Sequence, residues 1–395
     1  MKNRAIFTVG LVLMFGSCPA GAQNFAEILS SVEERNTTLN ALRLQTEADR
    51  LSARTGLAPS DPGLDLSYQW DMSGGNENKL ELNLMQTFDF PSVYCFRSRI
   101  AKGESLAADL RYAVKCKEIL YAAHCECIDV VYHNALSREL RKCYETADTL
   151  YEAVSRKFRA EETSVLEFNK IRLARINAMR AYESNEVELQ GHLDELARLN
   201  GGVPVSLDTD EFVPVELTED FDAWFARAKE RNPYLMELAT LSVIAGDRVK
   251  EAGAMWLPKL SIGYRGEKTS GVLLQGIAGG VSIPLWENHG RVKAARAQAE
   301  AARAREDAAV REFYNSLKLK YQKLQKMLVI ADEYRRRFAE MKSIDYLRAA
   351  LECGEISLLE YQVEYDYWHD AFFGMMASEC EIQKIVTDLN QWADF

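Results

Sequence analysis

Histidine, cysteine and acidic side chains gather in one stretch of the sequence, and these residue types are able to bind a metal ion. The stretch consists of His124, Cys125, Glu126 and Cys127, with Cys116, His133 and Cys143 nearby. Thiolates, imidazoles and carboxylates are the ligands that zinc takes in proteins. Residues two apart on a helix point to nearly opposite sides, so this spacing does not gather them around one ion. We therefore predict buried or lipid-sheltered thiols, with no metal site and no cofactor.

The histidines offer no catalytic arrangement either. All five lie in helix-like sequence without a nucleophile motif or a phosphate-binding loop: His124, His133, His192, His289 and His369. A secreted hydrolase would require a catalytic constellation, and the sequence contains none. We predict no catalytic residue and a protein that is not an enzyme.

The charge balance excludes another class of function. Among 395 residues, 59 are acidic and 48 are basic, which gives a net charge of -11. A surface that follows a phosphate backbone is basic. Nucleic acid is therefore not an expected partner.

The first residues have the pattern of a secretory signal. Lys2 and Arg4 precede an apolar run, and small residues end at Ala22 in an Ala-Gly-Ala triplet. The pattern predicts a signal peptide over residues 1–22 and a mature chain from Gln23. A second interpretation makes Cys18 a lipidated first residue, and both interpretations export the protein. No later stretch reaches the roughly 18 apolar residues of a spanning helix.

The chain repeats itself at an offset of 196 residues. Glu34-Arg35-Asn36 recurs at this offset as Glu230-Arg231-Asn232, and further on Ser164-Val165-Leu166-Glu167 corresponds to Ser357-Leu358-Leu359-Glu360, which lies 193 residues later. Each half is predicted to run helix, two strands, long helix, helix. We predict a first structural repeat at 23–200, an equatorial linker at 201–220 and a second repeat at 221–395.

Helices of unusual length dominate the prediction. From Pro91 to about Arg159 there is no further proline and only one glycine, so a continuous helix of about 68 residues would extend roughly 100 Å. Apolar residues between Leu358 and Leu389 alternate in steps of three and four, which is the period of a coiled-coil seam. The remaining helices are predicted at 25–57, 164–200, 221–255, 284–353 and 357–391.

Four short segments alternate apolar and polar residues as strands do. Their apolar positions are Leu64, Leu66, Tyr68 and Trp70, then Leu80, Leu82 and Leu84, then Leu260, Ile262 and Tyr264, and finally a weaker set with Ile277, Gly279, Val281 and Ile283. Strands of about ten residues fit a tilted membrane-spanning strand whose other face lines water. A soluble hairpin packed on helices has the same alternation, so both interpretations stay open.

A spanning sheet cannot leave its edges open in lipid, and four strands are too few to close. The strands would have to be pooled between identical subunits. Three subunits give twelve strands and two give eight. The duplication with long helices favours three, because each subunit then also contributes helices to a continuing wall.

The order of these elements resembles the TolC-like outer-membrane efflux family across nearly the whole mature chain. The resemblance implies a mainly α protein with a small β part, assembled as a homotrimer with a twelve-stranded transmembrane β-barrel and a periplasmic α-barrel. It also implies an exit duct in outer-membrane lipid for a tripartite efflux or type I secretion system, with a periplasmic adaptor (membrane fusion protein) and an inner-membrane pump as partners.

In this family the turns at the periplasmic tip carry a glycine, then Ser or Thr three residues later and an acid six residues later. Gly354, Ser357 and Glu360 match this pattern, whereas in the first repeat Glu161 stands in the glycine position before Ser164. The resemblance implies adaptor contacts at Glu161, Ser164, Gly354 and Ser357. A plain helix turn with serine as N-cap explains the same residues.

The resemblance also implies acidic rings at a closed periplasmic aperture. Glu360 falls at a matching place, and Val363 occupies a second position where the family has an acid. The adjacent Glu364 is the substitute, so Glu360 and Glu364 are the aperture candidates. Three copies of an acid around one axis would attract cations, whereas a solvated charge would do nothing.

A second class of function explains part of the pattern. A periplasmic coiled-coil adaptor or scaffold without a pore accounts for the seams, but not for two strand pairs in matching places. The sequence carries no signal for the cargo, so drugs, metal ions, peptides and proteins remain open.

Overall fold

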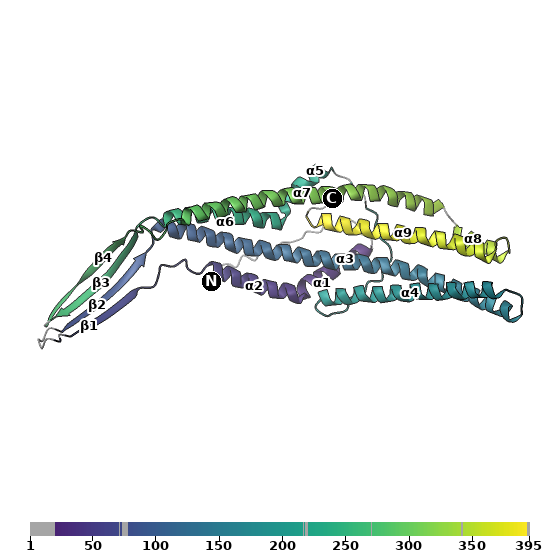
Figure 1. Cartoon of the computed structure of the whole chain (residues 1–395), viewed down its shortest axis with the longest axis horizontal. Coiled ribbons are helices and arrows are strands. Elements are labelled where there is room, and N and C mark those ends of the chain that lie inside the picture. The colour runs from purple at the N-terminus through teal and green to yellow at the C-terminus, as the bar shows by residue number, and fades with distance from the viewer. Residues whose placement is uncertain are drawn as a thin grey trace. The chain divides into compact units, whose positions relative to one another are not determined.

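The computed structural model describes residues 20–70, 72, 78–215, 217, 220–269, 271–340 and 343–392. Most of these residues are helical, and the strands lie side by side in one sheet (Figure 1). The elements are α1 (Ala20–Arg35), α2 (Thr37–Ala53), β1 (Gly63–Gln69), β2 (Lys79–Phe88), α3 (Pro91–Arg159), α4 (Val165–Leu199), α5 (Phe221–Arg231), α6 (Pro233–Ala254), β3 (Lys259–Thr269), β4 (Val272–Ser282), α7 (Arg291–Glu340), α8 (Ser343–Glu352) and α9 (Leu358–Asn390). A mainly α protein with a small β part is confirmed.

Two features expected from the sequence fall outside this description. Of the predicted signal peptide, only its last three residues are described, as the start of α1. Residues 73–77, between the first two predicted strands, lie wholly outside the described residues. Among the helices that the structure describes, none is both long and apolar enough to cross a membrane.

The helix predicted from Pro91 to about Arg159 is confirmed, whereas two shorter predicted helices are each divided at an asparagine. Helix α3 runs without interruption over its 69 residues. The helix predicted at 221–255 is divided at Asn232, whose side-chain oxygen accepts hydrogen bonds from the backbone N–H groups of Tyr234 (2.8 Å) and Leu235 (3.3 Å). An N-cap followed by Pro233 starts a new helix rather than continuing the old one. The prediction of one continuous helix there was wrong.

The same break occurs in the first half, at the equivalent asparagine. Helices α1 and α2 replace the helix predicted at 25–57, and Asn36 lies between them. Its buried amide donates a hydrogen bond to the carbonyl oxygen of Leu199, at 2.8 Å. The helix predicted from residue 284 instead begins at Arg291, because Asn288 is buried and its amide donates to the carbonyl oxygen of Met255.

The chain divides into two compact units that are not the two sequence repeats. The helical unit comprises Met1–Thr37, Glu118–Glu219 and Lys320–Phe395, and the sheet-bearing unit comprises Thr38–Lys117 and Asp220–Leu319. Each unit takes segments from both halves of the chain. The division into repeats therefore stays a prediction about the sequence.

The core of the helical unit lies where α1, α3 and α4 meet. Val32, Cys127 and Leu196 are fully buried there. The predicted linker packs on the same core through the buried Leu207, and Asn134 of α3 donates hydrogen bonds to the carbonyl oxygens of Leu207 (2.8 Å) and Thr209 (3.1 Å). These backbone groups are paired although the segment has no regular structure.

The sheet-bearing unit combines the sheet with α2, α5, α6 and parts of α3 and α7. All four strands are antiparallel, in the order β1-β2-β3-β4. Helices α3 and α6 approach closely at the only glycine of α3, because a Cβ atom on Gly103 would lie 2.6 Å from Cγ1 of the buried Ile244. A side chain there would separate the two helices.

Candidate channel-forming elements

The strand register aligns the predicted apolar positions on one face of the sheet. Directly opposed residues of antiparallel strands point to the same face. The opposed pairs that build this face are Leu64–Leu84, Leu66–Leu82, Tyr68–Leu80, Leu84–Tyr264, Leu260–Val281 and Tyr264–Ile277. The apolar face therefore continues across all four strands.

The side chains on this apolar face are exposed to solvent. Leu66 is 67% exposed, Ile262 56% and Ile277 86%. A hairpin packed on the chain's own helices would bury one face of its strands. The exposure contradicts that interpretation for β1 and β4, whose large apolar side chains are all solvent-exposed.

The opposite face of the sheet is polar at its centre. Arg265 of β3 pairs with Glu81 of β2, and Lys79 lies 3.1 Å from Glu267. Both pairs are diagonal, because Arg265 lies directly opposite Asn83 and Glu267 lies directly opposite Glu81. Long side chains reach their diagonal neighbours across antiparallel strands, and opposite charges there stabilise the pairing. A sheet with one apolar face and one charged face has the alternation of a membrane-spanning sheet, in which one face contacts lipid and the other contacts water.

Two predicted strand positions fall just beyond the strands. Trp70 follows the last residue of β1, and Ile283 follows the last residue of β4. Both side chains are exposed, as are the other predicted apolar side chains except Leu82, which is half-buried. Within the described part of the chain, β1 and β4 each pair with one neighbour, so each has an open edge.

The two turns at the predicted tips share one backbone conformation. Glu161 has φ of 60° and Gly354 has φ of 74°, both in the left-handed region. In each turn the next N–H group reaches back five residues: Glu162 N–H donates to Lys157 at 2.9 Å, and Glu355 N–H donates to Ala350 at 2.9 Å. This is the Schellman ending of a helix, which normally uses glycine. The first turn therefore keeps the glycine conformation with a glutamate.

Each turn then starts a new helix with a serine. Ser164 accepts a hydrogen bond from Glu167 N–H, and Ser357 accepts one from Glu360 N–H, both at 3.2 Å. In the second turn the Glu360 carboxylate also accepts from Ser357 N–H at 2.8 Å, which completes a capping box. These hydrogen bonds from Ser357 lower the pKa of the Glu360 carboxyl. Both turns lie at the same end of the helical unit (Figure 1).

Comparison with known proteins finds likeness in structure and none in sequence. No protein-family model matches the chain, and no curated protein matches it. A crystal structure of CusC has a TM-score of 0.74 at 14% identity, over 97% of this chain and 96% of that one. The Campylobacter jejuni CmeC outer membrane channel has a TM-score of 0.72 at 14% identity (93% and 85%). The outer membrane protein VceC from Vibrio cholerae has 0.68 at 14% identity (94% and 93%).

The chain has the TolC-like fold. The resemblance predicted from the sequence is thereby confirmed at the level of the fold. The coverage extends over almost all of this chain, so both the sheet and the helices belong to the likeness.

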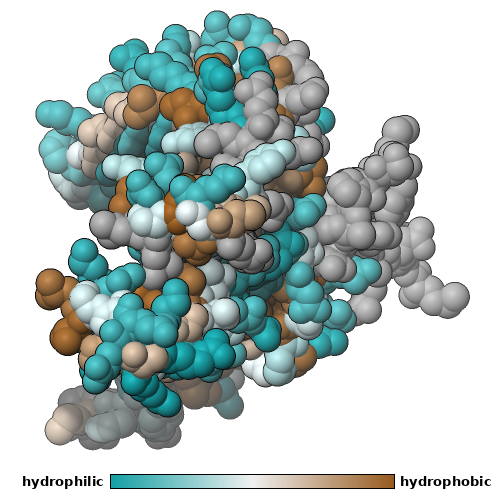
Figure 2. Space-filling view, turned by 90° about the vertical axis from the view of Figure 1, so that its right-hand side faces the viewer, coloured by the Kyte–Doolittle hydropathy of each residue, from teal (hydrophilic) through white to brown (hydrophobic). Residues whose placement is uncertain are grey.

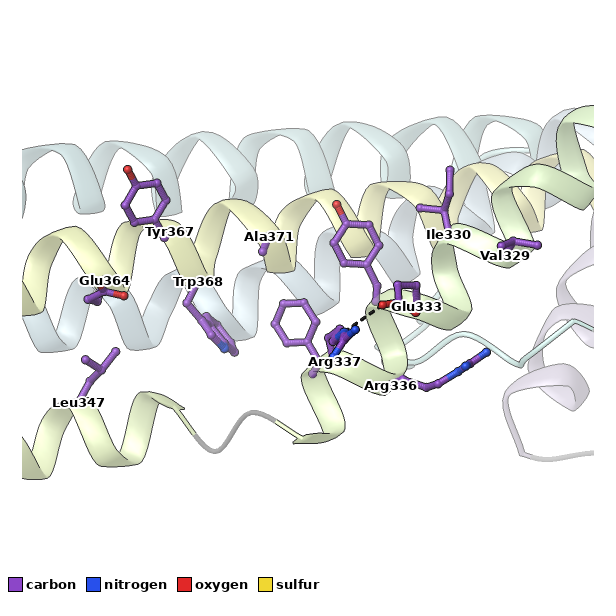
Figure 3. A pocket seen from close by; sticks show the side chains of 12 residues that line it. Val329, Ile330, Glu333, Arg336, Arg337, Leu347, Glu364, Tyr367, Trp368 and Ala371 are labelled. Atoms are coloured by element: carbon purple, nitrogen blue, oxygen red, sulfur yellow. Dashed lines mark hydrogen bonds and ion pairs between the residues drawn. The ribbon is translucent and has the colours of Figure 1, made fainter.

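Of the two aperture candidates, Glu360 is held in the capping box and Glu364 borders a groove. The groove, of about 700 Å³, lies between α7, α8 and α9 in the helical unit (Figure 3). Glu364, Trp368 and Leu347 line one part of the groove (Figure 3). On α7, Nε of Arg337 lies 2.9 Å from a carboxylate oxygen of Glu333. Seen toward the end that carries the turns, the surface is mostly hydrophilic with separate apolar patches (Figure 2).

The TolC-like fold also brings together cysteines and histidines that the sequence separates. Sγ of Cys143 on α3 lies 3.0 Å from Nε2 of His369 on α9. Burial raises the pKa of the Cys143 thiol to about 12 and lowers the pKa of His369. A nucleophilic cysteine requires the opposite shift, toward the thiolate. The pair is a packed thiol and a neutral imidazole rather than a catalytic dyad.

Sequence reasoning missed one group of side chains. Glu126, Asp129 and His192 meet at the contact of α3 with α4. Glu126 belongs to the stretch whose metal-binding ability was examined above, but its neighbours here are not the adjacent cysteines. A spacing of three along α3 was the only signal in the sequence, and the partner on α4 is 66 residues from Glu126.

Proposed function

We propose that this chain is the subunit of an outer-membrane exit duct. Three copies would pool their strands into a twelve-stranded transmembrane β-barrel, and their helices would form a tunnel in the periplasm. The duct conducts passively, and it performs no catalysis. The 23–200 and 221–395 repeats, joined by the 201–220 linker, would each supply one strand pair to the barrel.

The observation that carries this proposal is the sheet with an open apolar face and a polar face behind it. Apolar side chains exposed over four strands are costly in water, and each CH₂ group moved from water into hydrocarbon contributes about 0.8 kcal/mol. β2, β3 and β4 have 10, 11 and 11 residues, which is the length of a tilted membrane-spanning strand. β1 is shorter, at 7 residues.

The open edges of β1 and β4 argue for assembly from identical copies. Unpaired backbone groups cost several kcal/mol each in hydrocarbon, so a spanning sheet must close. Pairing β1 of one copy with β4 of the next closes it without any further strand. Three copies give twelve strands, within the range of known barrels.

The two turns are the proposed contacts for a periplasmic adaptor, and an inner-membrane pump would supply the energy. Glu161 and Gly354 shape the turns, and Ser164 and Ser357 begin the following helices. The matching geometry of the two turns supports two similar adaptor contacts per subunit. Drugs, metal ions, peptides and proteins all remain candidates for the cargo of such a tripartite efflux or type I secretion system.

Acidic residues near the turns are the proposed aperture lining. Glu360 and Glu364 are both exposed. Glu360→Gln separates charge from structure, because glutamine also completes a capping box. We expect this variant to fold normally and to lower the cation preference of the open duct, measured as a reversal potential in a salt gradient.

A periplasmic adaptor or scaffold is the alternative function. It would use the helices for binding, but it would leave the exposed apolar sheet without a role. No described contact favours this alternative.

Conductance across a planar lipid bilayer tests the proposal. Detergent-extracted protein is expected to give discrete current steps. Leu66→Arg places a charge on the apolar face, where arginine costs about 2–4 kcal/mol at the middle of a bilayer, and it is expected to abolish insertion. Ser67→Arg, on the polar face opposite Glu81, is the matched control and should still insert. Absence of current from well-folded wild-type protein would refute the duct.

A further inference from the structure

A cluster of metal-ligating side chains lies in the helical unit, apart from the sheet and the turns. Among the described residues, Glu126, Asp129 and His192 each bring one ligand atom within 4.8 Å of the other two. Glu126 and Asp129 are three apart on α3, so they share one face of that helix. His192 reaches them from α4. We propose that these three side chains bind a divalent transition-metal ion such as Zn²⁺.

The distances require only small side-chain movements. Nδ1 of His192 lies 2.7 Å from a carboxylate oxygen of Glu126. Zinc bonds of about 2.0–2.2 Å in tetrahedral geometry place neighbouring ligand atoms about 3.4 Å apart. The His192–Glu126 contact would open by less than 1 Å, and the Asp129 carboxylate would approach by at most about 1.4 Å, since its oxygen lies within 4.8 Å of the other two ligand atoms. An ion would then replace the proton that now joins the imidazole to the carboxylate.

Solvent reaches all three side chains. His192 and Glu126 are 25% and 24% exposed, and Asp129 is 16% exposed. The site is therefore neither sealed in the core nor spread over the surface. Three protein ligands with partial exposure leave a fourth position for water, as in open zinc sites.

The donor set selects the kind of metal. One imidazole with two carboxylates suits zinc, cobalt and other borderline divalent ions. Magnesium and calcium prefer all-oxygen sites with more ligands. Copper(I) prefers thiolate or thioether ligands, which the three-residue cluster does not contain.

Neighbouring residues hold the His192 ring in place. The imidazole of His133 stacks on it, with ring centroids 5.1 Å apart and an interplanar angle of 29°. Asn185 donates through Nδ2 to the carbonyl oxygen of His133 (3.0 Å), so its Oδ1 faces the ring and accepts from Nδ1 (2.8 Å). This arrangement assigns the proton of neutral His133 to Nδ1. Asn185 thus fixes the His133 ring, and the stacked His133 ring restricts the rotation of His192.

A lysine competes for one of the ligands. Nζ of Lys384 on α9 lies 2.6 Å from Oδ1 of Asp129, and the Cys380 thiol donates to the same oxygen at 3.6 Å. In the protein without metal, Lys384 neutralises Asp129. Removing the ammonium group leaves the carboxylate free to turn toward the ion.

Titration of the purified full-length protein with Co²⁺ tests the site, because cobalt absorbs visible light according to its ligands. We expect saturable binding of one Co²⁺ per chain, reversed by Zn²⁺. Glu126→Gln and His192→Gln should each weaken binding at least about tenfold. Lys384→Gln should tighten it, which a merely structural ion pair does not predict.

Matched controls separate this site from other ligands on the chain. Glu188→Gln and His289→Gln change exposed residues outside the cluster and should bind Co²⁺ as the wild type does. Circular dichroism of each variant checks that the helices remain. The proposal is wrong if well-folded wild-type protein shows no saturable binding, or if Glu126→Gln and Lys384→Gln both leave the affinity unchanged. The site does not depend on the proposed duct, so either idea can fail alone.

Discussion

At the scale of single residues, one position shows how the backbone can keep a family pattern that the sequence lacks. Glu161 departs from the glycine expected at the first turn, yet its φ of 60° lies close to the 74° of Gly354. A residue with a Cβ atom in this region costs about 1–2 kcal/mol. The surrounding Schellman hydrogen bonds hold Glu161 there.

The two turns should respond oppositely to substitution. Glu161→Gly is expected to stabilise the protein by about 1 kcal/mol, because it relieves the strain of the left-handed backbone. Gly354→Ala introduces that strain and should destabilise it by a similar amount. Thermal unfolding of detergent-solubilised protein, followed by circular dichroism, measures both. Equal shifts of the same sign would show that the backbone conformation does not decide stability here.

His369 makes stability depend on pH in a predictable direction. Burial lowers its pKa in the folded protein below the ordinary value of 6.5, although Glu139, Asp366 and Asp370 oppose this and only Lys142 adds to it. Between the lowered value and 6.5 the unfolded chain binds more protons, so stability is full above pH 6.5 and falls as the pH drops below it.

Replacing this histidine should flatten that dependence. His369→Phe keeps an aromatic ring beside Tyr365, whose ring centroid lies 4.4 Å from that of His369. We expect a smaller loss of melting temperature between pH 7.5 and pH 5 than in the wild type. An unchanged pH dependence would mean that carboxylates, and not His369, account for acid sensitivity.

At the scale of elements, helix length and strand periodicity could be predicted from the sequence, whereas the helix break at Asn36 could not. Helix α3 follows from the absence of interior proline, and the strand faces follow from alternation. Asn36 looks like an ordinary helix position in the sequence, whereas Asn232 before Pro233 is an N-cap pattern that the prediction overlooked. Asn36 donates a hydrogen bond to the carbonyl oxygen of Leu199 on α4, which is distant in the sequence. Asn232 instead caps the helix that directly follows it.

The Glu126–Asp129–His192 cluster was beyond prediction for a related reason. Two of its members follow from helical spacing, but the pairing of α3 with α4 sets which residue of α4 meets them. Helical periodicity defines a face and does not define the axial register between two helices. The sequence therefore pointed to the right stretch and to the wrong neighbours.

The close approach of α3 and α6 gives a test at this scale. Gly103→Ala improves helix propensity by about 1 kcal/mol, but the new methyl group would lie within 2.6 Å of Ile244. We expect net destabilisation, because overpacking costs typically about 1–3 kcal/mol. Gly191→Ala is the control, since Gly191 lies in α4 with nothing within 4 Å of its missing Cβ. It should stabilise the protein, and equal gains at both positions would contradict the close packing.

At the scale of the whole molecule, the proposed duct requires copies of the chain that complete one another's sheet. The open edges and the exposed apolar face belong to one subunit, and both are liabilities in water. In the proposed assembly, β1 of one copy pairs with β4 of the next, so the edges are hydrogen-bonded and the apolar face contacts lipid.

Disulfide cross-linking between strand edges tests this claim most directly. In one subunit β1 and β4 are three strand spacings apart, about 14 Å, which is too far for a disulfide. A cysteine at Ser67 would be combined with single cysteines along β4, in a chain whose exposed Cys95 and Cys353 are replaced by serine. We predict covalent trimers at alternate β4 positions after oxidation of membrane-extracted protein. Monomers at every β4 position, in protein that remains folded, would contradict the account.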